Sequence, residues 1–573
     1  MKAAEHTLTS WDGAELFYRS WIPLSRPKKA LLLFHRGHEH SGRWQQTVES
    51  LGLADVAVFA WDARGHGRSP GERGAARNLT DVVKDTDAFV RHVSEKYELP
   101  RENIIVLAHS LAAVTVAAWV HDHAPRIRAM ILVTPAFQVK LYLPFAIPAL
   151  RFRQRFFGAG RVTSYVKAGL LTRDRTEANR YDSDPLIFKQ IAVNVLLDLH
   201  DTAKRLVADA GAIHTPTLML SAGRDWIVRL NAQRTFFDRL SSPTKRARMF
   251  PAARHAMFHD LNREAVIQEI RSFVTGQFAE TTSATSLLNA DKSGYTRREF
   301  DRLSSDRGIP FAVARAGLRA AAGLSRGINI GWRSGFDSGL SLDYVYENRP
   351  RGRSPVGRVI DKSYLNSIGW RGIRERKRNL KIALTNGIWE LRRQGRPIHI
   401  LDIAAGAGRY VIEVMHELPE LPINALLRDY EEENVTAARR LAGEFGLSNV
   451  STVWGDAFDA DSVSKITPKA TIGLVSGLYE LFPSNADVLK SLGGLAAAME
   501  SGGVLIYTNQ PWHPQVEFIA RVLHNRDGQP WVMRRRTTAE MDELVRTAGF
   551  TKMSMEIDQW GMFSVSMARR NNA

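Results

Sequence analysis

The sequence predicts an α/β protein with two catalytic halves, and three observations support this prediction. In both halves, short apolar runs alternate with helical stretches, which is typical of parallel sheets whose strands are joined by crossover helices. One apolar run ends at Ser110, and another ends in a glycine-containing loop at residues 404–408. In addition, 573 residues are too many for a single hydrophobic core, so we expect several domains.

Composition excludes several classes of site. The chain has no cysteine, so disulfides, zinc–thiolate sites and iron–sulfur clusters are excluded. Residues 1–13 lack the apolar core of a secretory signal. The longest apolar stretch, residues 141–150, falls short of the roughly 20 residues that cross a bilayer. We therefore expect a cytoplasmic protein, in contact with a membrane at most as a peripheral protein on its inner face.

Positive charge is concentrated between the two halves. Residues 281–400 hold 23 Lys and Arg against 10 Asp and Glu, which is +13 of the net charge of +18. Such a stretch attracts phosphate on lipids or nucleic acid, but it is equally typical of a solvated helix face. The apolar spacing over residues 311–330 predicts a basic amphipathic helix, either on a membrane or joining two domains. We expect contact with an anionic membrane through residues 311–378, and the absence of an RNA-binding motif argues against a nucleic-acid partner.

The first half contains the residues of a serine hydrolase. Ser110 lies where a strand turns into a helix, and such a nucleophile turn needs small residues two positions before and after the serine. Alanines, Ala108 and Ala112, stand where glycines are usual. Asp225 follows a later strand and His255 follows another. This order along the chain differs from the orders found in the two serine protease classes.

A polar loop with the sequence HRGHEHSGR, residues 35–43, follows the first long apolar run. We predict that the backbone N–H groups of Gly37 and Leu111 hold a developing oxyanion. The histidines of the loop are not predicted to bind a metal, because no fourth ligand is evident. This loop, together with residues 62–74, resembles the monoacylglycerol lipase and lysophospholipase branch of the α/β-hydrolases over about residues 5–275.

That resemblance implies roles for the three residues. Ser110 would be the nucleophile, His255 the general base, and Asp225 the residue that orients it. The resemblance also implies a helical cap at about residues 137–210, whose apolar wall edged with arginines suits an acyl chain joined to an anionic head group. A cap that packs on the core without any lipid preference explains the same composition. The implied substrate is a lipid ester.

The second half begins with a strand and a glycine loop that contains Ala404, Gly406 and Gly408. Glycines there let the backbone approach a ligand at a helix N-terminus. The dinucleotide fingerprint is not met, because its third glycine is missing. Asp429 follows the next strand, in the position that binds ribose hydroxyls, and Asp456 follows the strand after it and suits an adenine amino group.

These motifs resemble the class I S-adenosylmethionine-dependent methyltransferases, a Rossmann-like fold, over about residues 360–570. The resemblance implies S-adenosyl-L-methionine as cofactor, with Asp402 and the two glycines at its methionine end. The signature of amino-group methylation is absent, so the acceptor is not identified. Tyr479, Glu480 and His513 are candidates for lining the acceptor site, although each is equally explained as packing.

As a whole, the chain resembles bacterial fusions of an α/β-hydrolase with a class I methyltransferase. We expect a hydrolase domain at 1–276, a basic linker with an amphipathic helix at 277–359, and a methyltransferase domain at 360–573. One hypothesis is a bifunctional enzyme that hydrolyses lipid esters and methylates a related lipid or head group. The alternative is an RNA or small-molecule methyltransferase whose other half is an unrelated esterase or a scaffold.

Overall fold

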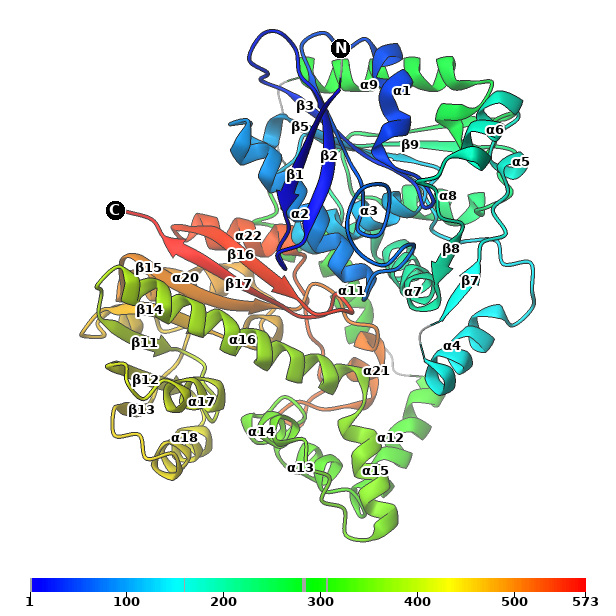
Figure 1. The fold of residues 1–573 in the computed structure, drawn as a ribbon. Coiled ribbons are helices and arrows are strands. Elements are labelled where there is room, and N and C mark those ends of the chain that lie inside the picture. Colours follow the sequence, from blue (N-terminus) through cyan, green and yellow to red (C-terminus); the bar gives the residue numbers. More distant parts are fainter. Residues whose placement is uncertain (1–2, 159, 281–284, 306–307, 573) are drawn as a thin grey trace. The chain divides into compact units, whose positions relative to one another are not determined.

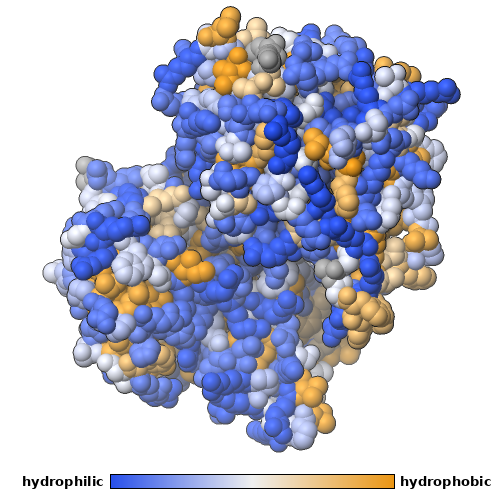
Figure 2. All heavy atoms as spheres, viewed as in Figure 1, coloured by the Kyte–Doolittle hydropathy of each residue, from blue (hydrophilic) through white to orange (hydrophobic). Residues whose placement is uncertain are grey.

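The computed structural model describes residues 3–158, 160–280, 285–305 and 308–572, and it divides into two compact units (Figure 1). The first unit is Met1–Thr285 and the second is Ser286–Ala573. Hydrophilic side chains cover most of the surface seen in Figure 2, with apolar patches scattered among them. Among the described residues, no helix has the length and apolar character needed to cross a membrane.

The first unit is built on an eight-stranded sheet with the order β1-β2-β4-β3-β5-β6-β9-β10. Its strands β3 to β6 are buried along their whole length, which explains why they are continuous apolar runs. The strands are β1 (Ala4–Thr9), β2 (Glu15–Trp21), β3 (Ala30–Phe34), β4 (Ala57–Trp61), β5 (Ile104–His109), β6 (Ala129–Val133), β9 (Thr217–Ala222) and β10 (Lys245–Phe250). From β4 onward in this order all pairs are parallel.

Helices cover both faces of this sheet, and each face has its own hydrophobic core. Helices α2 (Leu79–Lys96), α3 (Leu111–His123) and α8 (Leu230–Arg239) contribute to one core. Helices α1 (Gln45–Leu51) and α9 (Arg263–Ala279) contribute to the other. The α/β fold predicted for the first half is confirmed.

The segment between β6 and β9 forms a cap. Its elements are α4 (Ala146–Phe157), β7 (Arg161–Thr163), α5 (Ala168–Leu171), α6 (Arg175–Ser183), β8 (Gln190–Ala192) and α7 (Val193–Asp209). No residue of α4 is buried. Large apolar side chains at the start of the cap are 58–83% exposed, namely Tyr142, Leu143, Phe145, Phe152, Phe156 and Phe157. Exposed apolar area of this kind is typical of surfaces that meet lipid or protein.

The second unit is built on a seven-stranded sheet with the order β13-β12-β11-β14-β15-β17-β16, in which only β17 and β16 introduce antiparallel pairs. The strands are β11 (Ile398–Asp402), β12 (Ile423–Asp429), β13 (Val450–Trp454), β14 (Ala470–Val475), β15 (Met499–Asn509), β16 (Phe550–Ile557) and β17 (Ser564–Arg570). One face is covered by α16 (Ile368–Arg393), α17 (Arg409–Glu417) and α18 (Glu432–Glu444). The other is covered by α19 (Ala460–Ser464), α20 (Asn485–Ala498) and α22 (Thr538–Thr547). This arrangement confirms the α/β fold predicted for the second half.

The predicted linker was residues 277–359, and from Ser286 onward this region belongs to the second unit and is mostly helical. The helices are α10 (Ala290–Ser293), α11 (Tyr295–Ser304), α12 (Gly308–Ala322), α13 (Arg326–Ser334), α14 (Gly339–Glu347) and α15 (Pro355–Leu365). Phe336, Tyr344 and Leu365 share a hydrophobic cluster with Trp370 and Phe563 of the methyltransferase half.

The single helix predicted over residues 311–330 is wrong, because the structure has two helices there. Helix α12 ends at Ala322 and α13 begins at Arg326. The side chain of Ser325 caps α13 by accepting a hydrogen bond from the backbone N–H of Ile328 at 3.2 Å. A serine that caps a new helix ends the preceding one, and this signal was present in the sequence.

Candidate active sites

Ser110 lies at the turn between β5 and α3, at the carboxyl edge of the parallel strands. Its backbone has φ +59°, a conformation that is strained for a residue with a side chain. Such strain is characteristic of a nucleophile turn, which projects the serine hydroxyl from the top of the sheet. Ala108 and Ala112 are buried on either side of the turn, which is consistent with the small residues expected there.

The three residues of the predicted catalytic triad come together. The Nε2 atom of His255 lies 2.8 Å from Oγ of Ser110, and its Nδ1 atom lies 2.8 Å from Oδ2 of Asp225. The other oxygen of Asp225 accepts hydrogen bonds from the backbone N–H groups of Ile227 and Val228. Burial alone would raise the pKa of Asp225, but the His255 ring and these N–H groups outweigh it, so the pKa lies below its ordinary value. Asp225 is therefore held as a carboxylate that orients His255.

Gly37 and Leu111 lie close together beside Ser110. A Cβ atom added to Gly37 would lie 3.8 Å from Cδ1 of Leu111, and both residues line the same cavity as Ser110 and His255. The histidines of the loop form hydrogen bonds with other groups of the protein. The Nδ1 atom of His38 lies 2.6 Å from the carbonyl oxygen of Phe188, and burial lowers the pKa of His38 to about 4. Among the described residues, no three His, Asp or Glu side chains are grouped to hold a metal ion.

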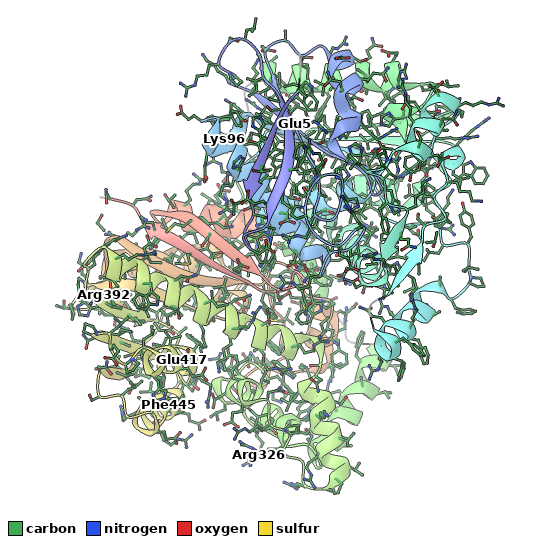
Figure 3. The ribbon with its side chains drawn as sticks, in the orientation of Figure 1. Glu5, Lys96, Arg326, Arg392, Glu417 and Phe445 are labelled. Carbon is green, nitrogen blue, oxygen red and sulfur yellow. The ribbon has the colours of Figure 1, made fainter. Side chains whose placement is uncertain are left out.

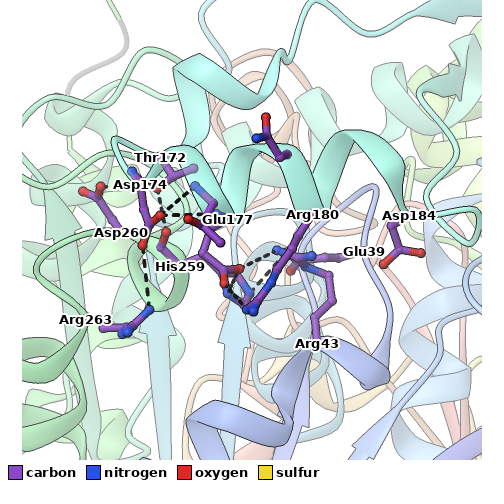
Figure 4. Close-up of polar contacts among 12 residues, drawn as sticks. Glu39, Arg43, Thr172, Asp174, Glu177, Arg180, Asp184, His259, Asp260 and Arg263 are labelled. Atoms are coloured by element: carbon purple, nitrogen blue, oxygen red, sulfur yellow. Dashed lines mark hydrogen bonds and ion pairs between the residues drawn. The ribbon is translucent and has the colours of Figure 1, made fainter.

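A buried polar network holds the loop that carries Gly37 (Figure 4). Glu39 accepts a hydrogen bond from Nε of Arg43 at 3.2 Å. Glu177, on cap helix α6, lies 3.3 Å from both Arg43 and His259. Because His259 follows His255 by four residues, this network connects the loop, the cap and the segment of the general base. It ties the loop to the cap and to the segment that carries His255.

The cavity beside Ser110 has a volume of about 470 Å³. Its walls are mainly apolar and come from the core and the cap, and they include Leu79, Leu141, Leu150, Val195, Leu199 and Ile227. A hydroxyl nucleophile at the wall of an apolar cavity is suited to an ester with a hydrocarbon chain.

In the second unit, the glycine loop follows β11 as predicted. Gly406 and Gly408 adopt φ of +57° and +65°. A Cβ atom on Gly408 would lie only 2.4 Å from Cδ1 of Leu427, so this position requires glycine. The carboxylate of Asp429 accepts a hydrogen bond from the N–H of Gly406 at 2.8 Å and another from the side chain of Asn434 at 2.9 Å. The loop is thus joined by a hydrogen bond to Asp429, the residue predicted to bind the ribose.

Asp402 is fully buried and supports the loop from behind. It accepts hydrogen bonds from the hydroxyl of Tyr410 at 2.7 Å and from the N–H of Ala404 at 3.2 Å. Burial raises its pKa to about 7. Enclosed in this way, Asp402 is hydrogen-bonded to the first residue of the loop.

The residues at the ends of β11, β12, β13 and β14 fit S-adenosyl-L-methionine. Asp456 follows β13 and accepts a hydrogen bond from the N–H of Phe458 at 2.8 Å. Tyr430 and Trp454 expose aromatic rings beside Asp429 and Asp456 in the sequence. The hydroxyl of Ser476, after β14, is buried without a hydrogen-bond partner in the described structure. A glycine loop, two carboxylates and an unpaired hydroxyl fit the donors and acceptors of such a nucleoside.

A second cavity of about 500 Å³ lies within this unit. Glu480 and His513, two of the predicted acceptor-site residues, line it. Tyr479 lies outside this lining. Its ring is buried in the core and its hydroxyl pairs with Ser491 at 3.1 Å, because the turn after β14 directs its side chain inward.

Most of the cavity lining could not be found from sequence motifs. Aromatic residues form much of it, namely Tyr364, Trp370, Phe518, Trp531 and Phe563. Three N–H donors of lining residues are buried without a partner in the described structure: Nε of Arg376, Nε2 of Gln510 and Nε1 of Trp531. Unpaired buried donors are costly unless a ligand satisfies them. They indicate a ligand that carries oxygen acceptors.

The fold is that of an α/β-hydrolase domain joined to a methyltransferase domain, and comparisons with known proteins agree. A family model described as "Putative methyltransferase" matches residues 270–570, and one described as "Serine aminopeptidase, S33" matches residues 25–262. The chain belongs to the first family and carries an S33 hydrolase domain at its N-terminal side.

One relative spans the whole chain, and others match about half of it. The chain is 45% identical over 579 residues to "Uncharacterized protein YnbC" of Escherichia coli, with 99% of each chain covered. A monoacylglycerol lipase of Mycolicibacterium smegmatis is 25% identical over 273 residues, which are 47% of this chain and 96% of the lipase. The crystal structure of a Paleococcus ferrophilus monoacylglycerol lipase, 25% identical, covers 46% of this chain and 99% of its own, with a TM-score of 0.42.

Proposed function

We propose that the protein is a bifunctional lipid enzyme, a serine ester hydrolase and an S-adenosylmethionine-dependent methyltransferase that acts on lipids or lipid head groups. The observation that carries the hydrolase half is the contact of Ser110 with His255 at the wall of an apolar cavity. The exposed apolar start of the cap and the likeness to monoacylglycerol lipases also support a lipid ester such as a monoacylglycerol or a lysophospholipid.

The geometry supports hydrolysis in two steps. His255 takes the proton of Ser110 as its oxygen attacks the ester carbonyl, and Asp225 stabilises the resulting imidazolium. The N–H groups of Gly37 and Leu111 hold the oxyanion. His255 then gives the proton to the departing alcohol, which leaves an acyl group on Ser110. Water, activated by the same histidine, releases the fatty acid and restores the serine.

We expect esters of long-chain fatty acids to be hydrolysed faster than esters of short-chain acids. Each methylene that enters the apolar cavity contributes about 0.8 kcal/mol of binding, so kcat/KM rises with chain length until the cavity is filled. The measurement is hydrolysis of a monoacylglycerol series from butanoyl to hexadecanoyl, each below its micelle concentration. The butanoyl ester serves as the internal control for catalytic competence. A series in which it is the best substrate would contradict the proposed acyl site.

In the methyltransferase half, bound S-adenosyl-L-methionine supplies an electrophilic methyl group. Asp429 would hold its ribose, Asp456 its adenine, and the backbone of Ala404, Gly406 and Gly408 its methionine end. The carboxylates at the two nucleoside positions and the open loop support this assignment. The acceptor would enter the aromatic cavity lined by Glu480 and His513.

The chemistry of that cavity favours an apolar acceptor with oxygen atoms. His513 accepts a hydrogen bond from the N–H of Gln515 on Nδ1, and burial lowers its pKa to about 4. A neutral ring bonded in this way carries its proton on Nε2, which makes His513 a fourth donor beside Arg376, Gln510 and Trp531. Aromatic walls with several donors suit an acyl or prenyl chain that ends in a carbonyl, carboxylate or hydroxyl group.

We also propose peripheral contact with an anionic membrane through the outer sides of α12 and α15, within the predicted range 311–378. Val313 of α12 and Val356 and Val359 of α15 are 64–68% exposed. Of the arginines of α12, Arg315 donates to the carbonyl of Arg521, and Arg319 is exposed and lies over the ring of Trp332. Both helices also line the acceptor cavity, so an acceptor drawn from a bilayer would have a short path to it.

Filling the acceptor cavity should stop methyl transfer without weakening cofactor binding. Gly317 of α12 lines the cavity, and a Cβ atom there would meet nothing within 4 Å. We expect Gly317→Phe to reduce label transfer from S-adenosylmethionine to a lipid extract by about tenfold or more, since an aromatic ring would occupy the acyl site. The matched control is Ala320→Phe, an exposed position on the same helix. Equal label transfer in both variants would contradict the assignment.

A further inference from the structure

The basic residues of the central region fall into two groups. In the group at residues 371–378 most charges are used within the protein. Lys377 pairs with Glu413 at 2.6 Å, and Arg376 is buried 3.4 Å from Glu480. Arg374 donates to the carbonyl of Leu365, Arg378 pairs with Glu375, and Arg371 lies over Trp560. Apart from the Nε of Arg376, which lines the acceptor cavity, this group is explained by contacts within the protein.

The second group of arginines lines a cleft of about 870 Å³ in the same unit. Five arginines come to it from three segments of the chain: Arg326 and Arg333 of α13, Arg351 and Arg353 of the loop between α14 and α15, and Arg526 of the loop that follows α21 (Val516–Val522). Glu431, Glu433 and Asp527 also line it, so the cations exceed the carboxylates. Like charges gathered in a concave surface raise the local potential and attract anions.

Three of these arginines are free to bind a ligand. Arg351 pairs with Glu347 at 2.6 Å, and Arg526 lies 3.4 Å from Asp337. Arg326, Arg333 and Arg353 form no ion pair with any residue that the structure describes. All three are exposed in the cleft. Holding unpaired guanidinium groups together is unfavourable unless an anion joins them.

Helix ends reinforce the positive charge. Helices α13, α14 and α18 all begin at this cleft, since Ser325, Ser338 and Glu431 precede their first residues and line it. The first backbone N–H groups of a helix have no partner within the helix, and its dipole is positive at that end. The first N–H groups of α13 and α14 already donate to Ser325, Asp361 and Ser338, so these helix ends contribute their dipoles only. The unpaired arginines supply the donors that phosphate requires.

We propose that this cleft binds a phosphate group, on a lipid head group or on a free phosphate compound. The site is separate from the acceptor cavity and does not depend on the proposed function. It borders the cofactor site, because Asn434 lines the cleft and donates to Asp429. Gly339 makes this approach possible, since a Cβ atom there would lie 2.2 Å from Oδ1 of Asn434. An occupied cleft would hold Gly339 and Asn434 in place beside Asp429, the residue proposed to bind the ribose.

The test compares two double variants of the full chain that remove the same charge. Arg333→Gln/Arg353→Gln changes the cleft. Arg392→Gln/Arg393→Gln changes two exposed arginines at the end of α16. Arg392 lies well apart from Arg326 in Figure 3. Pyrophosphate binding is measured by calorimetry. Vesicle binding is measured by sedimentation with phosphatidylcholine vesicles that do or do not contain phosphatidylglycerol.

We expect the cleft variant to weaken binding of at least one of these phosphate probes about tenfold or more, and the control to stay near wild type. Loss with pyrophosphate identifies a free phosphate compound as a sufficient ligand, whereas loss only with anionic vesicles identifies the lipid head group. Equal losses in both variants, or no loss in either, would overturn the site. Matching thermal unfolding curves of the variants exclude misfolding as the cause.

Discussion

Ser110→Ala is expected to lower kcat/KM for ester hydrolysis by about 10⁴-fold or more, since the nucleophile, its base and the orienting carboxylate act as one unit. The side chain removed is the one that contacts Nε2 of His255 at 2.8 Å. The remaining N–H groups of Gly37 and Leu111 would still bind an oxyanion, which explains why some activity over water is retained. The measurement is steady-state release of fatty acid from a monoacylglycerol.

A matched control separates loss of chemistry from loss of structure. Ser183 ends cap helix α6, is exposed, and donates only to the carbonyl of Asn179. Ser183→Ala should hydrolyse the same ester at about the wild-type rate. Ser110→Ala should also lose reaction with a fluorophosphonate while it unfolds at the wild-type temperature. Retention of hydrolysis by Ser110→Ala would mean that another residue carries the reaction.

Asp429→Ala is expected to weaken binding of S-adenosylmethionine about 100-fold. The carboxylate would bind the ribose hydroxyls through charge-assisted hydrogen bonds, each of which contributes about 1.5–3 kcal/mol. It also holds the loop through the N–H of Gly406. The measurement is the Kd for the cofactor by calorimetry, with Glu444→Ala as the control because Glu444 ends the neighbouring helix α18 on the surface.

A second substitution at the same position separates the two contributions of Asp429. Asn in place of Asp keeps an acceptor for the N–H of Gly406 but removes the charge. We expect an intermediate loss of affinity, about 10-fold, because the loop stays in place while the hydrogen bonds to the ribose weaken. Unchanged Kd values in both variants would place the ribose elsewhere.

The sequence was sufficient to predict those site residues that come directly after a strand. Ser110, Asp225 and the glycine loop each come immediately after a buried strand, and the carboxyl ends of parallel strands lie at one edge of a sheet. His255 follows the last strand of its sheet in the same way. For this reason, the alternation of apolar runs and polar turns was sufficient to predict that the residues of each site lie close together.

The acceptor cavity could not be predicted, because its lining comes from segments far apart in the sequence. Helices α12 and α15 supply one wall, and Trp370, Gln510 and Trp531 come from other elements. In the sequence, the many arginines of residues 286–359 suggested a linker. The apolar residues of this segment nevertheless pack against the rest of the second unit. From the sequence, Tyr479 and Glu480 were equal candidates for the acceptor site. Only the fold shows that the side chain of Tyr479 faces the core and that of Glu480 faces the cavity.

The most direct test of the bifunctional account is one incubation of the full chain with monoacylglycerols, lysophospholipids and methyl-labelled S-adenosylmethionine, repeated with Ser110→Ala. We predict fatty-acid release that depends on Ser110, and label in a lipid fraction whether or not that serine is present. Release that is independent of Ser110, or label that appears only in water-soluble products or RNA, would contradict the account.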